Sequence, residues 1–74
     1  MPPEPGWNAE TGLVNRIGPL RAERGLTQAG LAEACGVSRK TINTVERGRF
    51  VPSAVLALKI ARVLGVRVEE VFEV

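Results

Sequence analysis

Residues 28–47 constrain the fold most, because they have the pattern of two short helices joined by a tight turn. Apolar residues recur at helical spacing as far as Gly36, which interrupts the run. Ser38 can then cap a new helix by accepting a hydrogen bond from a free backbone N–H group. Ile42 and Val45 recur three residues apart and mark the face of this second helix that points inward.

The outward face of the second helix is polar in a way that packing does not explain. It carries Arg39, Lys40, Asn43, Thr44 and Arg47. Such side chains gain nothing from an apolar partner, but they suit the edges of base pairs. In the major groove Arg and Lys donate to guanine, Asn can bridge adenine, and a Thr methyl can touch thymine. The face therefore predicts contact with DNA.

A wider set of residues extends this pattern on both sides. These residues are Thr27-Gln28, Leu31-Ala32, Gly36-Val37-Ser38, Ile42, Val45-Glu46, Gly48 and Pro52-Ser53. In them the chain resembles the lambda-repressor-like helix-turn-helix family, which includes Cro, phage repressors and Xre. The resemblance is nearly continuous from Arg21 to Phe72. It covers most of the chain and is specific for the family, not for one member.

The resemblance implies an all-α fold, a five-helix lambda-repressor-like bundle over residues 13–74. It also implies a small two-stranded antiparallel sheet made by residues 13–17 and 71–74. We expect the first helix to run from Pro19 to Arg24, because proline has no N–H group to lose at a helix start.

Residues 1–12 have a different composition, with three of the five prolines and little apolar surface. Such a stretch does not bury enough to offset its ordering entropy, so we expect a mobile tail. Trp7 is its one large apolar side chain. It is either an exposed ring or an anchor for a partner or for dimer packing.

The resemblance also implies roles for single residues. The base contacts are expected at Arg39, Lys40, Asn43 and Thr44. The phosphate contacts are expected at Gln28, Thr41, Arg47 and Arg49, where ordinary solvated positions are the alternative for Gln28 and the two arginines. In the family pattern Arg21 forms a structural ion pair with Glu46, and a solvated Arg21 is the alternative. Phe50 is expected to cover the edge of the core.

Charge is unevenly distributed along the chain. Between Leu13 and Val66 there are nine Arg and Lys residues against three Glu residues, and the other five Glu residues lie nearer the ends. A basic middle with acidic ends predicts one surface that faces a polyanion.

A chain of 74 residues has room for one small core. With one cysteine it forms no internal disulfide, so dimerisation is a natural supplement. The fourth helix is expected to begin after Ser53 and to end at Gly65, and it has more apolar perimeter than one core needs. We expect a homodimer interface that includes Val55, Leu58, Val66 and Val71. Cys35 lies on an inner helix face and is interpreted as a core residue, with redox sensing as the alternative.

These features predict a sequence-specific DNA-binding transcriptional regulator, a repressor that binds a palindromic operator as a homodimer. The alternative is an antitoxin or adaptor that binds a partner protein through Trp7 or the fourth helix. Without a histidine, a phosphate loop or a nucleophile beside a base, we expect no metal, no cofactor and no enzymatic activity. No apolar run or signal-peptide pattern indicates a membrane, so we expect a cytoplasmic protein at the nucleoid.

Overall fold

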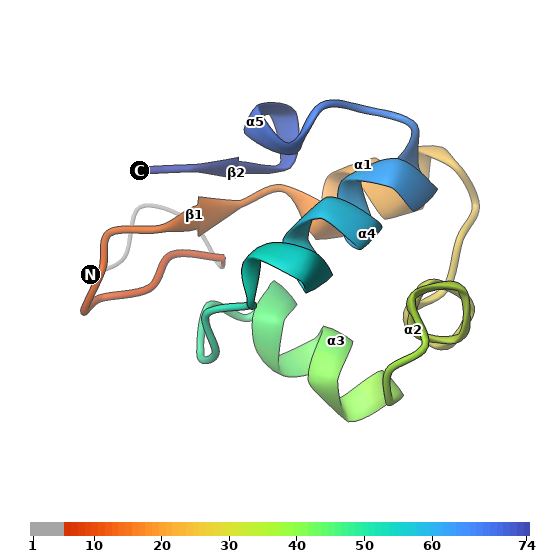
Figure 1. Cartoon of the computed structure of the whole chain (residues 1–74), viewed down its shortest axis with the longest axis horizontal. Helices are drawn as coiled ribbons and strands as arrows, with labels where there is room; N and C mark the ends of the chain where they lie inside the picture. The colour runs from red at the N-terminus through yellow and green to blue at the C-terminus, as the bar shows by residue number, and fades with distance from the viewer. Residues whose placement is uncertain (1–5) are drawn as a thin grey trace.

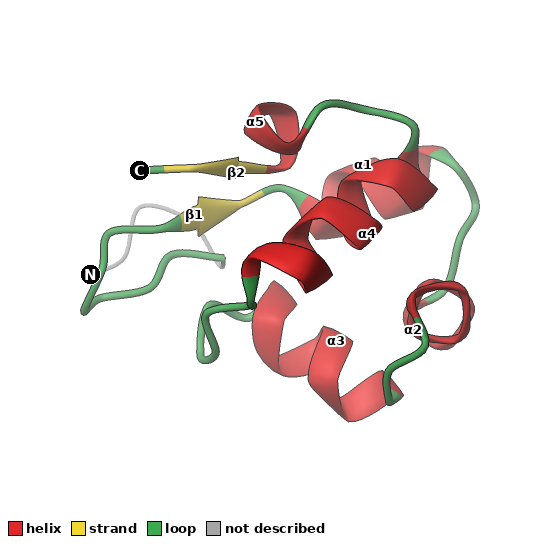
Figure 2. Cartoon of the chain, viewed as in Figure 1, coloured by secondary structure: helices red, strands yellow, loops and turns green. Residues whose placement is uncertain are grey.

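Helices make up most of the computed structural model, which describes residues 6–74. The elements in chain order are β1 (Val14–Asn15), α1 (Ile17–Glu23), α2 (Gln28–Cys35), α3 (Arg39–Glu46), α4 (Ala54–Leu64), α5 (Val68–Val71) and β2 (Phe72–Glu73). Figure 1 and Figure 2 show α2 and α3 along one edge of the molecule, with the two strands side by side near the chain ends. The predicted five-helix bundle with a small sheet is confirmed for the described residues.

Local signals explain where the three longer helices begin and end. Thr27, Ser38 and Ser53 each accept a hydrogen bond from the backbone N–H group three residues further on. Helices α2 and α4 end at Gly36 and Gly65, whose φ angles of 73° and 72° are left-handed. The turn between α2 and α3 is therefore set by a glycine and a serine.

Helix α1 begins at Ile17, two residues before the predicted start at Pro19. Pro19 is the third residue of this helix. The first four N–H groups of a helix have no partner within it, so proline removes no hydrogen bond at this position. Pro19 therefore lies in the first turn of α1, as predicted, but it is not the first residue of that helix.

The sheet brings the two ends of the domain together. Val14 pairs with Glu73 and Asn15 with Phe72 in antiparallel register. The pairing continues into α1, because the N–H group of Arg16 donates to the carbonyl oxygen of Val71 at 2.8 Å.

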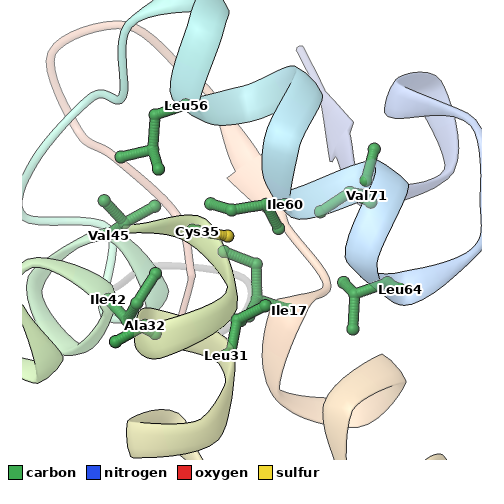
Figure 3. Packing of buried hydrophobic residues seen from close by; sticks show 11 residues of the cluster. Ile17, Leu31, Ala32, Cys35, Ile42, Val45, Leu56, Ile60, Leu64 and Val71 are labelled. Atoms are coloured by element: carbon green, nitrogen blue, oxygen red, sulfur yellow. The ribbon is translucent and has the colours of Figure 1, made fainter. Parts of the chain in front are cut away.

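The core lies between the helices, as Figure 3 shows. Its fully buried large side chains are Ile17, Leu31, Ile42, Ile60, Leu64, Val45 and Val71. Cys35 is 3% exposed and belongs to this core, as predicted. Burial raises the pKa of its thiol, although the charge of Lys59 acts in the opposite direction. The thiol therefore stays protonated at neutral pH, which does not favour a redox sensor.

Val71 was expected at a dimer interface, but it is 0% exposed within the single chain. The short helix α5 turns this side chain toward α4, so Val71 is a core residue.

Residues 6–12 also differ from the expectation of a mobile tail over residues 1–12. The Asn8 side-chain amide donates to the carbonyl oxygen of Gly48 at 2.9 Å, and the Asn15 amide donates to that of Gly6 at 3.2 Å. Trp7 is half-buried. Hydrogen bonds and the half-buried Trp7 side chain hold this stretch against the domain. The rest of the expected tail, residues 1–5, lies outside the described residues.

Candidate nucleic-acid interface

The inner face of helix α3 packs into the core, and its outer face is exposed to solvent. Ile42 and Val45 are 0% and 1% exposed, and both belong to the core. At about 100° per residue, this places Lys40 and Arg47 on the opposite side of the helix. Both are exposed, and so is Arg39. The structure thus gathers three of the predicted DNA-binding cations on one helix face and at its end.

The cations of this face form no ion pair within the described part of the chain. Among residues 6–74, the ion pairs are formed by Arg16, Arg21 and Arg24. Arg39, Lys40, Arg47 and Arg49 form none there, and Arg49 is exposed in the loop that follows α3. Their charges are therefore available to a polyanion.

Two of the predicted contact residues touch each other across the helix-turn-helix. The side-chain amide of Asn43 on α3 donates to Gln28 Oε1 on α2, over a long 3.4 Å. Because this contact uses only Gln28 Oε1, the amide N–H groups of Gln28 are left to donate, as a phosphate contact requires. The contact joins one predicted base-contact residue to one predicted phosphate-contact residue.

The hydroxyl of Thr44 is engaged with its own helix. Its Oγ1 lies 2.9 Å from the carbonyl oxygen of Thr41 and 3.1 Å from that of Lys40. A hydroxyl has one hydrogen to donate, so the Thr44 hydroxyl can only accept from a base edge, and its methyl group remains for contact with a thymine methyl. The Thr41 hydroxyl is paired with that of Ser38 at 2.9 Å. Either hydroxyl of this pair can be the donor, so Thr41 can still donate to a phosphate when Ser38 donates to it.

Phe50 departs from the prediction that it covers the core edge, because 51% of it is exposed. It lines a shallow hollow with Ser38, Lys40, Thr41 and Thr44. The loop after α3 places the Phe50 ring beside the outer face of α3 and not over the core. Sequence reasoning missed this because Phe50 lies in a loop, where no helical periodicity indicates its direction.

Arg21 and Glu46 fix α3 to α1. Arg21 Nη2 lies 2.9 Å from Glu46 Oε1, and Nε lies 3.1 Å from Oε2, so the pair is bidentate. The two side chains are only 20% and 12% exposed. The hydrogen bonds that Arg21 donates to the Glu46 carboxylate raise the pKa of Arg21. The Arg21 Nη1 group also donates to the carbonyl oxygen of Leu26 at 3.0 Å, so this guanidinium is structural and not part of the open basic face.

The predicted dimer residues do not form one surface. Val55 and Leu58 are 62% and 58% exposed on α4 and line a hollow with Lys59 and Arg62. Val66 is half-buried and packs against the core, and Val71 is fully buried as described above.

No helix in residues 6–74 is long and apolar enough to cross a membrane. The same residues contain no cluster of His, Cys, Asp or Glu that could hold a metal ion.

Comparisons with known proteins agree with a helix-turn-helix domain. The helix-turn-helix family HTH_3 matches residues 20–71. An uncharacterised HTH-type transcriptional regulator of Methanocaldococcus jannaschii is 47% identical over 60 residues, which cover 81% of this chain and 91% of that protein. The immunity repressor of Bacillus phage phi105 is 39% identical over 56 residues, covering 76% of this chain and 39% of the repressor.

A solved structure agrees with the fold. The restriction-modification controller protein C.AhdI from Aeromonas hydrophila matches with a TM-score of 0.70 and 37% identity, covering 73% of this chain and 82% of that protein. The residues matched by the family, 20–71, include the helix-turn-helix that carries the open basic face.

Proposed function

Because the chain belongs to the lambda-repressor-like helix-turn-helix family HTH_3, we propose that it represses transcription by binding a palindromic operator as a homodimer. The observation that carries the proposal is the outer face of α3. Its inner side chains are buried in the core, while Arg39, Lys40 and Arg47 are exposed and have no acidic partner among the described residues.

In this proposal α3 lies in the major groove and reads base edges. Arg39 and Lys40 donate to guanine, and Asn43 contacts adenine. Thr44 contributes its methyl group to a thymine contact, because its hydroxyl is bonded to the helix backbone.

Other residues hold the DNA backbone without reading sequence. Gln28 is the first residue of α2, so its amide and the positive end of that helix can meet one phosphate. Arg47 and Arg49, at the end of α3 and beyond it, would neutralise phosphates and add affinity that falls with salt. Thr41 would donate its hydroxyl hydrogen to a phosphate while accepting a hydrogen bond from the Ser38 hydroxyl.

Self-association is proposed through the exposed face of α4. Val55 and Leu58 are large apolar side chains that remain accessible after the core is complete. A two-fold dimer would place two copies of α3 about 34 Å apart, one turn of DNA. A dimer on its operator would exclude other proteins from the same base pairs, and similarity to a phage immunity repressor supports that mode of action. Its place would be at the nucleoid in the cytoplasm.

Substitution of Arg39 and Arg49 should have different effects on DNA binding. We expect Arg39→Ala to weaken operator binding by about 1–3 kcal/mol and to relax specificity at one base pair. Arg49→Ala should weaken binding to all sequences alike and lower the slope of log K against log salt by about 1. Titrations of operator and single-base variants at several salt concentrations measure both. An unchanged base preference in Arg39→Ala would show that Arg39 reads no base.

A charge on the exposed face of α4 should separate the dimer. We expect Leu58→Glu to raise the dimer dissociation constant at least about ten-fold, because it places a charge in an apolar contact. Val74→Glu, at a residue that is 92% exposed, is the matched control and should leave association unchanged. Analytical ultracentrifugation measures both. A wild-type chain that sediments as a monomer at tens of micromolar would contradict the proposed dimer.

A further inference from the structure

The carbonyl groups at the end of α3 meet side chains from the start of the chain. The amide Nδ2 of Asn15 lies 2.9 Å from the carbonyl oxygen of Val45 and 3.3 Å from that of Glu46. The amide Nδ2 of Asn8 lies 2.9 Å from the carbonyl oxygen of Gly48. The last four carbonyl groups of a helix have no partner within it. Two asparagines 30 or more residues away in the chain thus donate to carbonyl oxygens in the last turn of α3 and in the loop that follows it. The carbonyl oxygen of Val45 also accepts from the N–H group of Gly48 at 3.0 Å.

Asn15 connects the end of α3 to the start of α1. It is 9% exposed, the only buried polar side chain in the described part of the chain. Its Oδ1 accepts a hydrogen bond from the N–H group of Ile17, the first residue of α1, at 3.2 Å. Its backbone pairs with Phe72 in the sheet. The side chain of Asn15 therefore joins two helix ends, and its backbone joins them to the sheet.

Asn8 presents its donor from a closed turn. Its Oδ1 accepts from the N–H groups of Glu10 and Thr11, each at 3.0 Å, and its own N–H group donates to Leu13 at 2.8 Å. These bonds fix the side chain, so that its Nδ2 is directed at Gly48. Asn8 thus uses Oδ1 and its backbone N–H group in the turn, and Nδ2 in the contact with Gly48.

We infer that Asn8 and Asn15 are positioning residues, which fix the C-terminal end of α3 so that its outer face meets the base edges in register. This inference rests on the proposed function in DNA reading. Base-specific hydrogen bonds tolerate errors of only about 0.5 Å, whereas contact of cations with the phosphate backbone tolerates more. Loss of the positioning contacts therefore lowers operator binding more than binding to unrelated DNA.

The test uses Asn8→Asp, because substitution of the buried Asn15 can unfold the chain. Aspartate keeps the Oδ1 acceptor of the turn and removes the donor to Gly48. It also adds a negative charge, so the matched control is Ala9→Asp, which adds the same charge at the exposed neighbouring residue. Binding to operator and to unrelated duplex is measured at a temperature at which thermal melts show all three proteins folded.

We expect the ratio of operator to unrelated-DNA affinity to fall about three- to ten-fold in Asn8→Asp relative to Ala9→Asp, as the loss of one hydrogen bond implies. Trp7 is the single tryptophan, and its fluorescence should change in Asn8→Asp, because this segment loses its contact with Gly48. Equal ratios in the two variants would overturn the inference and leave the proposed function standing. A wild-type chain without preference for any duplex would overturn the proposed function, and the inference with it.

Discussion

Gly48→Ala is expected to lower the free energy of unfolding by about 3 kcal/mol. Gly48 has a φ of 73°, where a side chain costs about 1–2 kcal/mol. A Cβ atom there would also lie 2.5 Å from the carbonyl oxygen of Trp7 and 2.8 Å from its carbonyl carbon. These are backbone atoms, so residues 6–8 would have to move away, which adds about 1–3 kcal/mol.

Gly65→Ala separates the two contributions. Gly65 has nearly the same φ, 72°, and no other part of the described structure lies within 4 Å of a Cβ built on it. This substitution should cost only the backbone strain, about 1 kcal/mol. Urea unfolding of both variants measures the difference. If Gly48→Ala lost no more stability than Gly65→Ala, residues 6–8 would not pack against the end of α3 in solution.

Removal of Arg21 is the second large effect. We expect Arg21→Ala to lower the free energy of unfolding by about 3 kcal/mol, because it leaves the largely buried Glu46 carboxylate without its bidentate partner. It also removes the hydrogen bond to the carbonyl oxygen of Leu26. For a domain of this size the melting temperature should fall by more than about 10 °C.

The double variant Arg21→Met, Glu46→Leu is the matched comparison. It replaces both charges with apolar groups of similar size, so no unpaired charge remains between α1 and α3. We expect it to retain a higher melting temperature than Arg21→Ala. An equal or larger loss in the double variant would show that the pair is not the source of the effect.

Features with a local cause could be predicted from the sequence. Ser38 caps α3 and Gly36 ends α2 because of properties of single residues, a hydroxyl acceptor and a backbone free to adopt positive φ. The inward direction of Ile42 and Val45 follows from helical spacing. The pairing of β1 with β2 was predicted from the family resemblance.

Features that depend on contacts between distant segments could not be predicted in this way. Val71 is apolar, but only the packing of α5 against α4 decides that it is a core residue and not an interface residue. Phe50 follows a loop whose path has no periodic signal. Residues 6–12 contain a single large apolar side chain, Trp7, and the hydrogen bond from Asn8 to Gly48 crosses 40 residues of chain.

Selection of bound sequences from a random duplex library, with the purified protein at physiological salt, tests the central claim most directly. If the outer face of α3 reads base edges in a two-fold dimer, the selected sequences should be enriched in a palindromic motif. Its half-sites should lie about 10 base pairs apart. Salt-sensitive binding without an enriched motif would contradict sequence-specific recognition, because phosphate contacts alone give affinity without specificity. In that case the exposed face of α4 would be the place to look for a protein partner.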